Sequence, residues 1–303
     1  MTCQQGILIE PVPPVARHVF YTLGEAADLP RALKALTELV DGTDTIAGLG
    51  ISVLQALGQS LGPLRAFPAL SNQGIDVPST QQALWLWLRG EDRGELLYRT
   101  MQLEKVLAPA FRPVQVTEAF RYLSGHDLTG YEDGTENPVD DEAVEVVTAK
   151  GAEGGSYAAV QHWEHDLEYF KSLPQPDQDH IIGRRLSDNE EIEDAPEFAH
   201  VKRTAMEDFD PEAFVVRRSM PYIDGAVNGL VFLAFGESLD PFEVQLRRMI
   251  GLDDGITDGL FRFSRPVTGG YYWCPPVQDG KLVIDFCTVA AGPDGTLRQT
   301  ALR

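Results

Sequence analysis

The sequence predicts an α+β fold made of two ferredoxin-like halves. Strand-like and helix-like segments follow the order strand, helix, strand, strand, helix, strand, and the same order then begins again. The chain has 303 residues and is 43% hydrophobic and 23% charged, an ordinary globular composition with room for two units of about 150 residues. We therefore expect halves at residues 1–140 and 150–303, joined near residues 139–154.

In the first half, alternating or aromatic-rich apolar runs favour strands, and apolar residues at helical spacing favour helices. Gly42 ends the first of these helices and Pro109 the second. The expected elements are a strand at residues 18–24, a helix at 29–42, a strand entering a short helix at 44–53, a strand at 83–90, a helix at 93–108 and a strand at 114–123.

The second half repeats this order around one long interruption. The expected elements are a strand at residues 155–163, a helix at 164–173, strands at 213–219 and 229–236, a helix at 240–251 and a strand at 269–276. Residues 174–211 interrupt the pattern and carry a run of six acidic residues before His200. A connection of this length is uncommon in a compact domain unless it serves a function.

The net charge of −21 excludes several classes of partner. It leaves no excess of Lys and Arg to neutralise nucleic-acid phosphates, and it disfavours binding to an anionic membrane. No apolar run is long enough to span a bilayer, and no secretory signal is visible at the start. The three cysteines are widely spaced and offer no disulfide framework. We expect a cytoplasmic protein that binds neither nucleic acid nor membrane.

The segment GHDLTGYEDGTENP, residues 125–138, concentrates carboxylates and amides among glycines and a proline. Such a composition is typical of a turn, and it also suits a loop whose oxygens serve a site. It lies at the expected junction of the two halves, a common place for a pocket. The composition alone leaves both interpretations open.

The six histidines show no spacing typical of a zinc site, and the chain has no nucleotide-binding loop and no nucleophile elbow. What remains is a single histidine ligand in a largely apolar cavity. Haem is the cofactor that needs only one such ligand.

Several motifs together resemble the dye-decolourising peroxidases. Gly130, Asp133 and Gly134 form the G-x-x-D-G motif of that family. Six further blocks follow in the family's order, over almost the whole chain: GGSYAAVQHWEHDLE, IIGRRLSDNEEI, AHVKRT, VVRRSMPY, LVFLAFG and FRFSRPVTGGYYW. The similarity is greatest to the compact bacterial B-type (P-type) branch.

The resemblance implies a dimeric α+β barrel of two ferredoxin-like halves, with haem b held mainly by the second. It assigns the proximal iron ligand to His200, the distal acid to Asp133 and the distal arginine to Arg217. The other implied site residues are a distal polar group at Ser219, a carboxylate behind the proximal imidazole at Asp258, propionate partners at Arg184 and Arg218, and pocket walls at Phe232 and Phe261.

These residue types suit a peroxidase. One acid–base group must take a proton from hydrogen peroxide and return it to the leaving oxygen, and a fixed positive charge must stabilise that oxygen. The expected function is reduction of hydrogen peroxide with one-electron oxidation of dyes, phenolic compounds or metal ions. Aromatic residues at strand spacing are more often core than an electron relay, so no relay is assigned.

Two other functions fit parts of the sequence. A haem or iron storage, delivery or deferrochelation protein would use the same fold, and a calcium- or magnesium-binding loop at residues 127–137 would need no haem. That loop departs from EF-hand spacing, which disfavours the metal interpretation. We expect a homo-oligomer, and no motif specifies its size or an encapsulating shell.

Overall fold

The computed structural model describes residues 1–149, 154–284, 288–291 and 297–300. The first half of the chain contains, in order, β1 (Val15–Leu23), α1 (Leu29–Leu39), β2 (Thr45–Leu49), α2 (Ile51–Ala56), the hairpin β3 (Leu70–Asn72) and β4 (Ile75–Val77), β5 (Leu84–Gly90), α3 (Arg93–Leu107) and β6 (Phe111–Phe120). Apart from the short hairpin, this is the expected strand–helix–strand–strand–helix–strand order.

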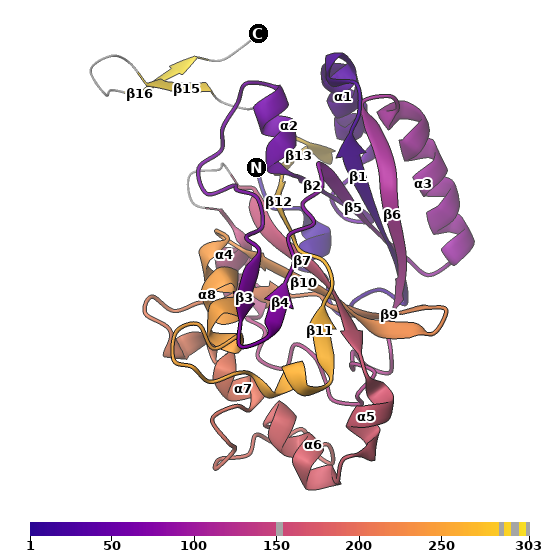
Figure 1. Ribbon diagram of the computed structural model, residues 1–303. Coiled ribbons are helices and arrows are strands. Elements are labelled where there is room, and N and C mark those ends of the chain that lie inside the picture. The colour runs from indigo at the N-terminus through magenta and orange to yellow at the C-terminus, as the bar shows by residue number, and fades with distance from the viewer. Residues whose placement is uncertain (150–153, 285–287, 292–296, 301–303) are drawn as a thin grey trace.

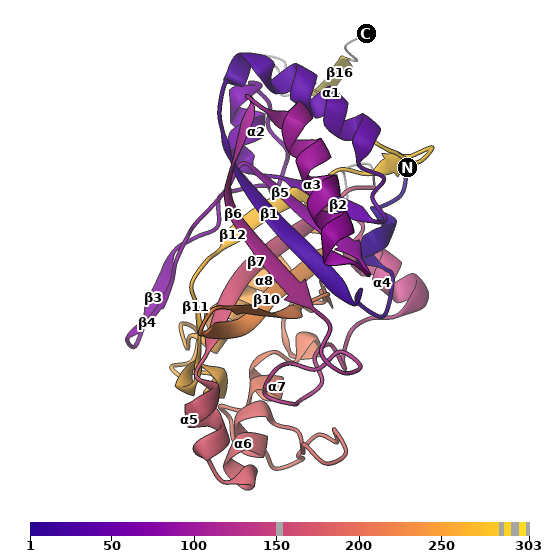
Figure 2. The ribbon, with the colours of Figure 1, turned by 90° about the vertical axis from the view of Figure 1, so that its right-hand side faces the viewer.

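The second half contains α4 (Asp140–Val147), β7 (Ser156–His165), α5 (Leu167–Ser172), α6 (Gln175–Ile182), α7 (His200–Arg203), β8 (Val216–Arg217), β9 (Met220–Asp224), β10 (Val227–Gly236), α8 (Asp240–Met249), β11 (Ser264–Pro266) and β12 (Gly270–Cys274). The minor strands β13 (Val277–Gln278), β14 (Lys281–Leu282), β15 (Thr288–Ala291) and β16 (Leu297–Thr300) come after them. In Figures 1 and 2, α1, α2 and α3 lie toward one end of the molecule and α5 and α6 toward the other.

The main strands form one closed antiparallel barrel. Its order is β7-β12-β2-β5-β1-β6-β9-β10, and β10 pairs back onto β7. The short strand β11 pairs with β7 on the same edge as β12, and β8 pairs with β10 on the same edge as β9. Each half contributes four neighbouring strands in the ferredoxin-like arrangement. The halves meet at two narrow seams, where Trp273 pairs with Leu49 and Ala119 pairs with Tyr222. The predicted duplicated barrel is confirmed.

Alternation along the strands divides the core into an inner and an outer part. The barrel interior holds bulky aromatic and aliphatic side chains, including Trp85, Trp87 and Phe235. His18 and His162 are buried within it. The outer faces of the strands pack against the helices. Gln161 and Trp163, which flank His162 on β7, therefore face outward, toward the second-half helices.

The structure corrects the expected elements in three places. Residues 220–228, expected as a connection, form the strand β9 and a two-residue turn into β10, with Gly225 at φ +59°. The expected strand at 213–219 is reduced to the two residues of β8. β7 runs on to His165 because it pairs with Ser264 of β11, and the following helix begins later, at Leu167, where Asp166 caps it.

No helix among the described residues is long and apolar enough to cross a membrane. Cys3 and Cys274 are buried free thiols, and Cys287 lies outside the described residues.

Candidate active site

A cavity lies outside the barrel, against the outward face of β7 and β10, and encloses about 890 Å³ of empty space including its open mouth. One face of α8 covers it, because Phe242, Leu246 and Met249 recur at helical spacing. Mostly apolar walls with a few convergent polar groups are typical of a ligand site. The full lining is Asp127, Thr129, Tyr131, Glu132, Asp133, Gln161, Trp163, His165, Ile182, His200, Thr204, Arg217, Leu230, Phe232, Phe242, Gln245, Leu246, Met249, Leu260, Phe263 and Ser264.

His200 is the first residue of the short helix α7 and lines this cavity. Its Nδ1 lies 2.8 Å from Oδ2 of Asp258, a carboxylate that is only 1% exposed. An ionised carboxylate can only accept hydrogen bonds, so the imidazole donates from Nδ1. The lone pair of the neutral ring is therefore on Nε2, the nitrogen that metal-binding histidines of this kind present to a metal.

Asp258 is itself held in place by the backbone. It caps the short 3₁₀ helix Gly259–Arg262, where Oδ1 accepts a hydrogen bond from the Leu260 amide at 2.8 Å. The Asp258 amide donates to the Met249 carbonyl at 2.7 Å, at the end of α8. Each carboxylate oxygen thus has one fixed partner, which fixes the orientation of the His200 ring.

Asp133 and Arg217 meet at the same cavity, although they are far apart in the chain. Arg217 Nη1 lies 3.6 Å from Asp133 Oδ1, and about a fifth of each side chain is exposed. Arg217 belongs to β8, whose pairing with β10 places it opposite Ala234. The site therefore combines one carboxylate and one permanent positive charge beside each other.

A second polar group in the cavity was not assigned from the sequence. His165 Nε2 lies 3.1 Å from Asp127 Oδ2, and His165 Nδ1 lies 2.7 Å from the Ser264 hydroxyl. Burial acts to raise the pKa of Asp127, but the hydrogen bond and charge of His165 and the hydrogen bonds of Thr129 outweigh it and hold the pKa below its usual value. Asp127 is part of the same loop as Asp133, which is the only sequence signal that pointed to it.

Gln161 was also missed. It is 1% exposed, lines the cavity, and accepts a hydrogen bond from Trp163 Nε1 at 3.3 Å. Its Nε2 has no hydrogen-bond partner among the described residues. A buried amide donor left unpaired is costly, so its position in the wall suits a ligand that offers an acceptor.

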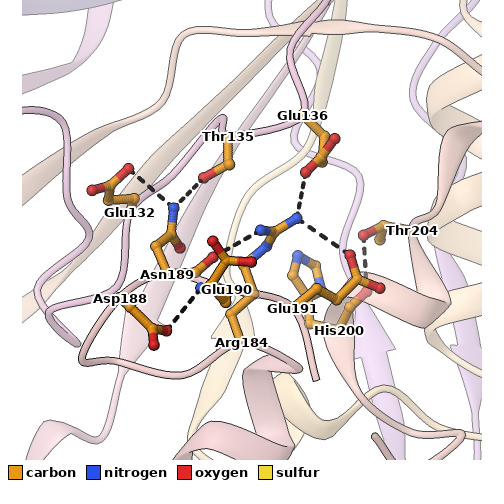
Figure 3. Close-up of polar contacts among 10 residues, drawn as sticks. All are labelled: Glu132, Thr135, Glu136, Arg184, Asp188, Asn189, Glu190, Glu191, His200 and Thr204. Carbon is orange, nitrogen blue, oxygen red and sulfur yellow. Dashed lines mark hydrogen bonds and ion pairs between the residues drawn. The ribbon is translucent and has the colours of Figure 1, made fainter. Parts of the chain in front are cut away.

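Several expected site residues lie elsewhere. Arg184 is not part of the cavity lining; its guanidinium donates to Glu136, to Glu191 at 3.4 Å and to the Asn189 carbonyl at 2.9 Å. Figure 3 shows it between the two carboxylates, where it joins the Asp133 loop to the acidic segment before His200.

Arg218, expected to contact a haem propionate, does not line the cavity. Neighbouring residues of a strand point to opposite faces, so Arg218 faces away from Arg217. It is buried against the N-terminal segment and donates to the Ile7 carbonyl at 2.8 Å and to Glu10 at 2.7 Å. Burial lowers the pKa of its guanidinium, and the Glu10 carboxylate opposes that shift.

Of the remaining expected residues, one lines the cavity and two do not. Phe232 lines the cavity, whereas Phe261 packs behind Trp163 at 5.4 Å between ring centroids. Ser219 is not among the lining residues, and its hydroxyl lies 3.5 Å from the Leu233 amide. The structure therefore brings Asp133, His200 and Arg217 together with Phe232.

Comparison with known proteins gives one consistent result. A family model described as Dyp-type peroxidase, C-terminal, matches residues 124–279. A dye-decolorizing peroxidase of Mycolicibacterium paratuberculosis is 30% identical over 89% of this chain and 83% of that protein.

Solved structures agree with this match. A dye-decolorizing protein from V. cholerae aligns with a TM-score of 0.80 at 31% identity, over 89% of this chain and 96% of its own. DyPB from Rhodococcus jostii RHA1 aligns with a TM-score of 0.80 at 25% identity, over 90% and 96%, in agreement with a B-type chain. The chain belongs to the Dyp-type peroxidase family.

Proposed function

We propose that this protein is a haem peroxidase that reduces hydrogen peroxide and oxidises small reductants in one-electron steps. The observation that carries the proposal is one cavity that contains both a histidine oriented by a buried carboxylate and a carboxylate–arginine pair. The first pair suits an iron ligand and the second suits proton transfer beside a fixed positive charge.

The cavity residues fit haem b. Phe232, Phe242, Leu246 and Met249 supply apolar walls for a flat hydrophobic ring. Gln161 Nε2, which has no partner among the described residues, is a donor for a polar atom of the ligand. A DypB variant from Rhodococcus jostii RHA1, 25% identical to this chain with a TM-score of 0.80, was solved in complex with haem. When bound, haem supplies the redox chemistry, since it takes two oxidising equivalents from peroxide and passes them on singly.

His200 would hold the haem iron through Nε2. Asp258 would keep the ring in the tautomer whose Nε2 lone pair is free, and its negative charge would make the imidazole a stronger donor. Because the Leu260 amide and the His200 ring occupy different oxygens of Asp258, neither contact has to break for the other to form.

Asp133 and Arg217 would act on the peroxide. Asp133 is placed to accept the proton of one peroxide oxygen and to deliver it to the leaving oxygen, so that water departs rather than hydroxide. Arg217 stays charged and would stabilise the negative charge that develops on the leaving oxygen. Charge stabilisation of this kind usually contributes more to the rate than one proton relay that water can replace. We therefore assign Arg217 a larger contribution to the rate of the peroxide step than Asp133.

The reducing substrates are proposed by chemical class: dyes, phenolic or other aromatic compounds, and metal ions. The net charge of −21 favours neutral or cationic reductants over anionic ones, weakly and in a salt-dependent way. A DypB variant at 25% identity was solved in complex with manganese, which supports metal ions as a class. An encapsulated relative from Mycobacterium smegmatis, 26% identical, was solved by cryo-EM.

We further propose a cytoplasmic homo-oligomer. Within it, residues 1–140 would form the half that carries the Asp133 loop, and residues 150–303 the half that carries His200. Deferrochelation is the less favoured alternative, because a deferrochelatase of Escherichia coli is 26% identical over only 51% of this chain and 44% of that protein.

The test is peroxide-dependent oxidation of a dye by the haem-loaded protein. Reduction of one hydrogen peroxide to two waters takes two electrons, so two molecules of a one-electron donor should be oxidised per peroxide. Omission of peroxide is the control. Release of iron or intact haem without dye oxidation would contradict the peroxidase assignment and favour haem handling.

A further inference from the structure

The loop that carries Asp133 is tied directly to the strand that carries Arg217. Asn137 ends a turn that begins at Gly134, and its backbone N–H donates a hydrogen bond to the Gly134 carbonyl at 3.0 Å. Its side chain then makes two hydrogen bonds to the backbone of Arg217. The Arg217 amide donates to Asn137 Oδ1 at 2.8 Å, and Asn137 Nδ2 donates to the Arg217 carbonyl at 3.0 Å.

These two hydrogen bonds occupy the positions at which a neighbouring strand would bond to β8. β8 is only two residues long and lies at the outer edge of the sheet, beside β10. The next residue, Arg218, donates its amide to the Leu233 carbonyl of β10, so the amide and carbonyl of Arg217 point to the open side. The Asn137 carboxamide offers one acceptor and one donor there, as a neighbouring strand would. Arg218 Nη1 adds a hydrogen bond to the same carbonyl at 2.9 Å.

The turn is equally well defined on the Asp133 side. The Asp133 amide donates to the Gly125 carbonyl at 3.1 Å, which closes the base of the loop. Gly134 has φ +80°, and a Cβ at this position would come within 2.7 Å of Asn137 Nδ2. A glycine is required because the Asn137 carboxamide packs directly over it.

We propose that Asn137 is the positioning residue that sets Arg217 against Asp133 and so fixes their separation of 3.6 Å. The inference rests on the proposed function, in which these two side chains act on peroxide. Asn137 acts through Arg217. Without these two hydrogen bonds, β8 keeps its pairing with β10 and the Arg218 contact to the Arg217 carbonyl, but the Arg217 backbone is no longer bonded to the loop of Asp133.

Asn137→Ala should lower kcat/KM for hydrogen peroxide by about 10- to 100-fold, since a shift of about 1 Å at a reacting pair can cost that much. The KM for the dye should stay unchanged. Asn137→Asp keeps the acceptor for the Arg217 amide but loses the donor to its carbonyl, and should give a smaller loss. Asn189→Gly is the matched control. It removes an amide that contacts Glu132 and Thr135 of the same loop, at a position with φ +59° where glycine is unstrained.

A double-mutant cycle separates positioning from general destabilisation. If Asn137 acts through Arg217, Asn137→Ala should change the peroxide rate less than about twofold in an Arg217→Leu background. A full additional loss in that background would overturn the inference. If the alanine variant does not fold, the aspartate variant decides: a peroxide rate equal to wild type would also overturn it.

Hydrogen exchange gives a readout that is independent of activity. In the purified haem-loaded protein, the Arg217 amide should exchange at least about tenfold faster in Asn137→Ala than in wild type or Asn189→Gly, because it loses the only acceptor that it has among the described residues. Unchanged exchange would overturn the inference. Failure of the proposed function looks different, because then wild type and Arg217→Leu would both lack a peroxide-dependent step while the exchange result still holds.

Discussion

Asp258→Asn replaces one oxygen of the carboxylate behind His200 with an NH₂ group, which removes one of two acceptors. In the wild type, Oδ1 accepts from the Leu260 amide and Oδ2 accepts from His200 Nδ1, both at 2.8 Å. Asparagine has one acceptor and one donor in their place. If its oxygen faces Leu260, its NH₂ faces His200 and forces the proton onto Nε2, the nitrogen needed for iron. If the amide turns over, its NH₂ meets the Leu260 N–H, and two donors face each other.

The expected loss of haem affinity follows from the hydrogen bond that this variant loses. A hydrogen bond to a charged group contributes about 1.5–3 kcal/mol, and Asp258 is too buried for solvent to compensate. This corresponds to a haem dissociation constant raised by about 10- to 150-fold. The assay is transfer of haem from the protein to an excess of a tighter haem acceptor, monitored through the Soret band.

Asp253→Asn is the matched control, because Asp253 is an exposed carboxylate of the same segment and pairs with Arg247. We expect wild-type haem transfer in this variant. A haem dissociation constant for Asp258→Asn within about twofold of wild type would refute the assignment of Asp258 as the residue that orients His200.

Two further predictions concern the peroxide step and the barrel interior. Arg217→Leu should slow the change in the resting haem spectrum on stopped-flow mixing with peroxide more than Asp133→Asn does, with haem retained in both; the reverse order would make the aspartate the principal catalyst. Burial lowers the pKa of His162 to about 4 from about 6.5 when unfolded. Between these values only the unfolded chain takes up the proton, so the contribution of His162 to stability is complete above about pH 6.5 and falls as the pH drops toward about 4. From about pH 7 to about pH 5 this loss should be about 2 kcal/mol. The free energy of unfolding, measured in urea at the two pH values, should therefore fall by about 2 kcal/mol less in His162→Gln than in wild type. An equal fall in both proteins would contradict this prediction.

Much of the fold could be predicted because strand and helix periods are local signals. The order of elements in the first half could be predicted from alternation of apolar residues, a glycine at a helix end and Pro109. β9 was missed because Pro221 lies inside it, although the two-residue connection at Gly225 is a hairpin signal. Closure of the barrel depends on the β7–β10 pairing and on two seams of one residue pair each, which no local pattern contains.

The candidate site was only partly predictable, for a similar reason. Asp133, His200 and Arg217 came from motifs, and they line one cavity. Contacts between distant segments, such as Asp127 with His165, have no spacing rule in a single sequence. Arg217 and Arg218 are neighbours in the strand expected at residues 213–219, so alternation alone indicates that only one of them faces the cavity.

The acidic segment before His200 contacts the loop that carries Asp133. Arg184 joins it to Glu136, and Asn189 joins it to Glu132 and Thr135 of the Asp133 loop. Figure 3 shows these contacts as one group beside His200 and Thr204. These contacts link the acidic segment before His200 to the loop that carries Asp133.

The central claim is that His200 holds a haem that reacts with peroxide in this cavity. The most direct measurement is the absorption spectrum of the haem-loaded protein before and after one equivalent of hydrogen peroxide, in wild type and in His200→Ala. We predict a Soret band in wild type that changes on rapid mixing and returns after two equivalents of a one-electron donor. His200→Ala should remain folded by circular dichroism and lose that band. A normal Soret band and a normal peroxide response in His200→Ala would contradict the account.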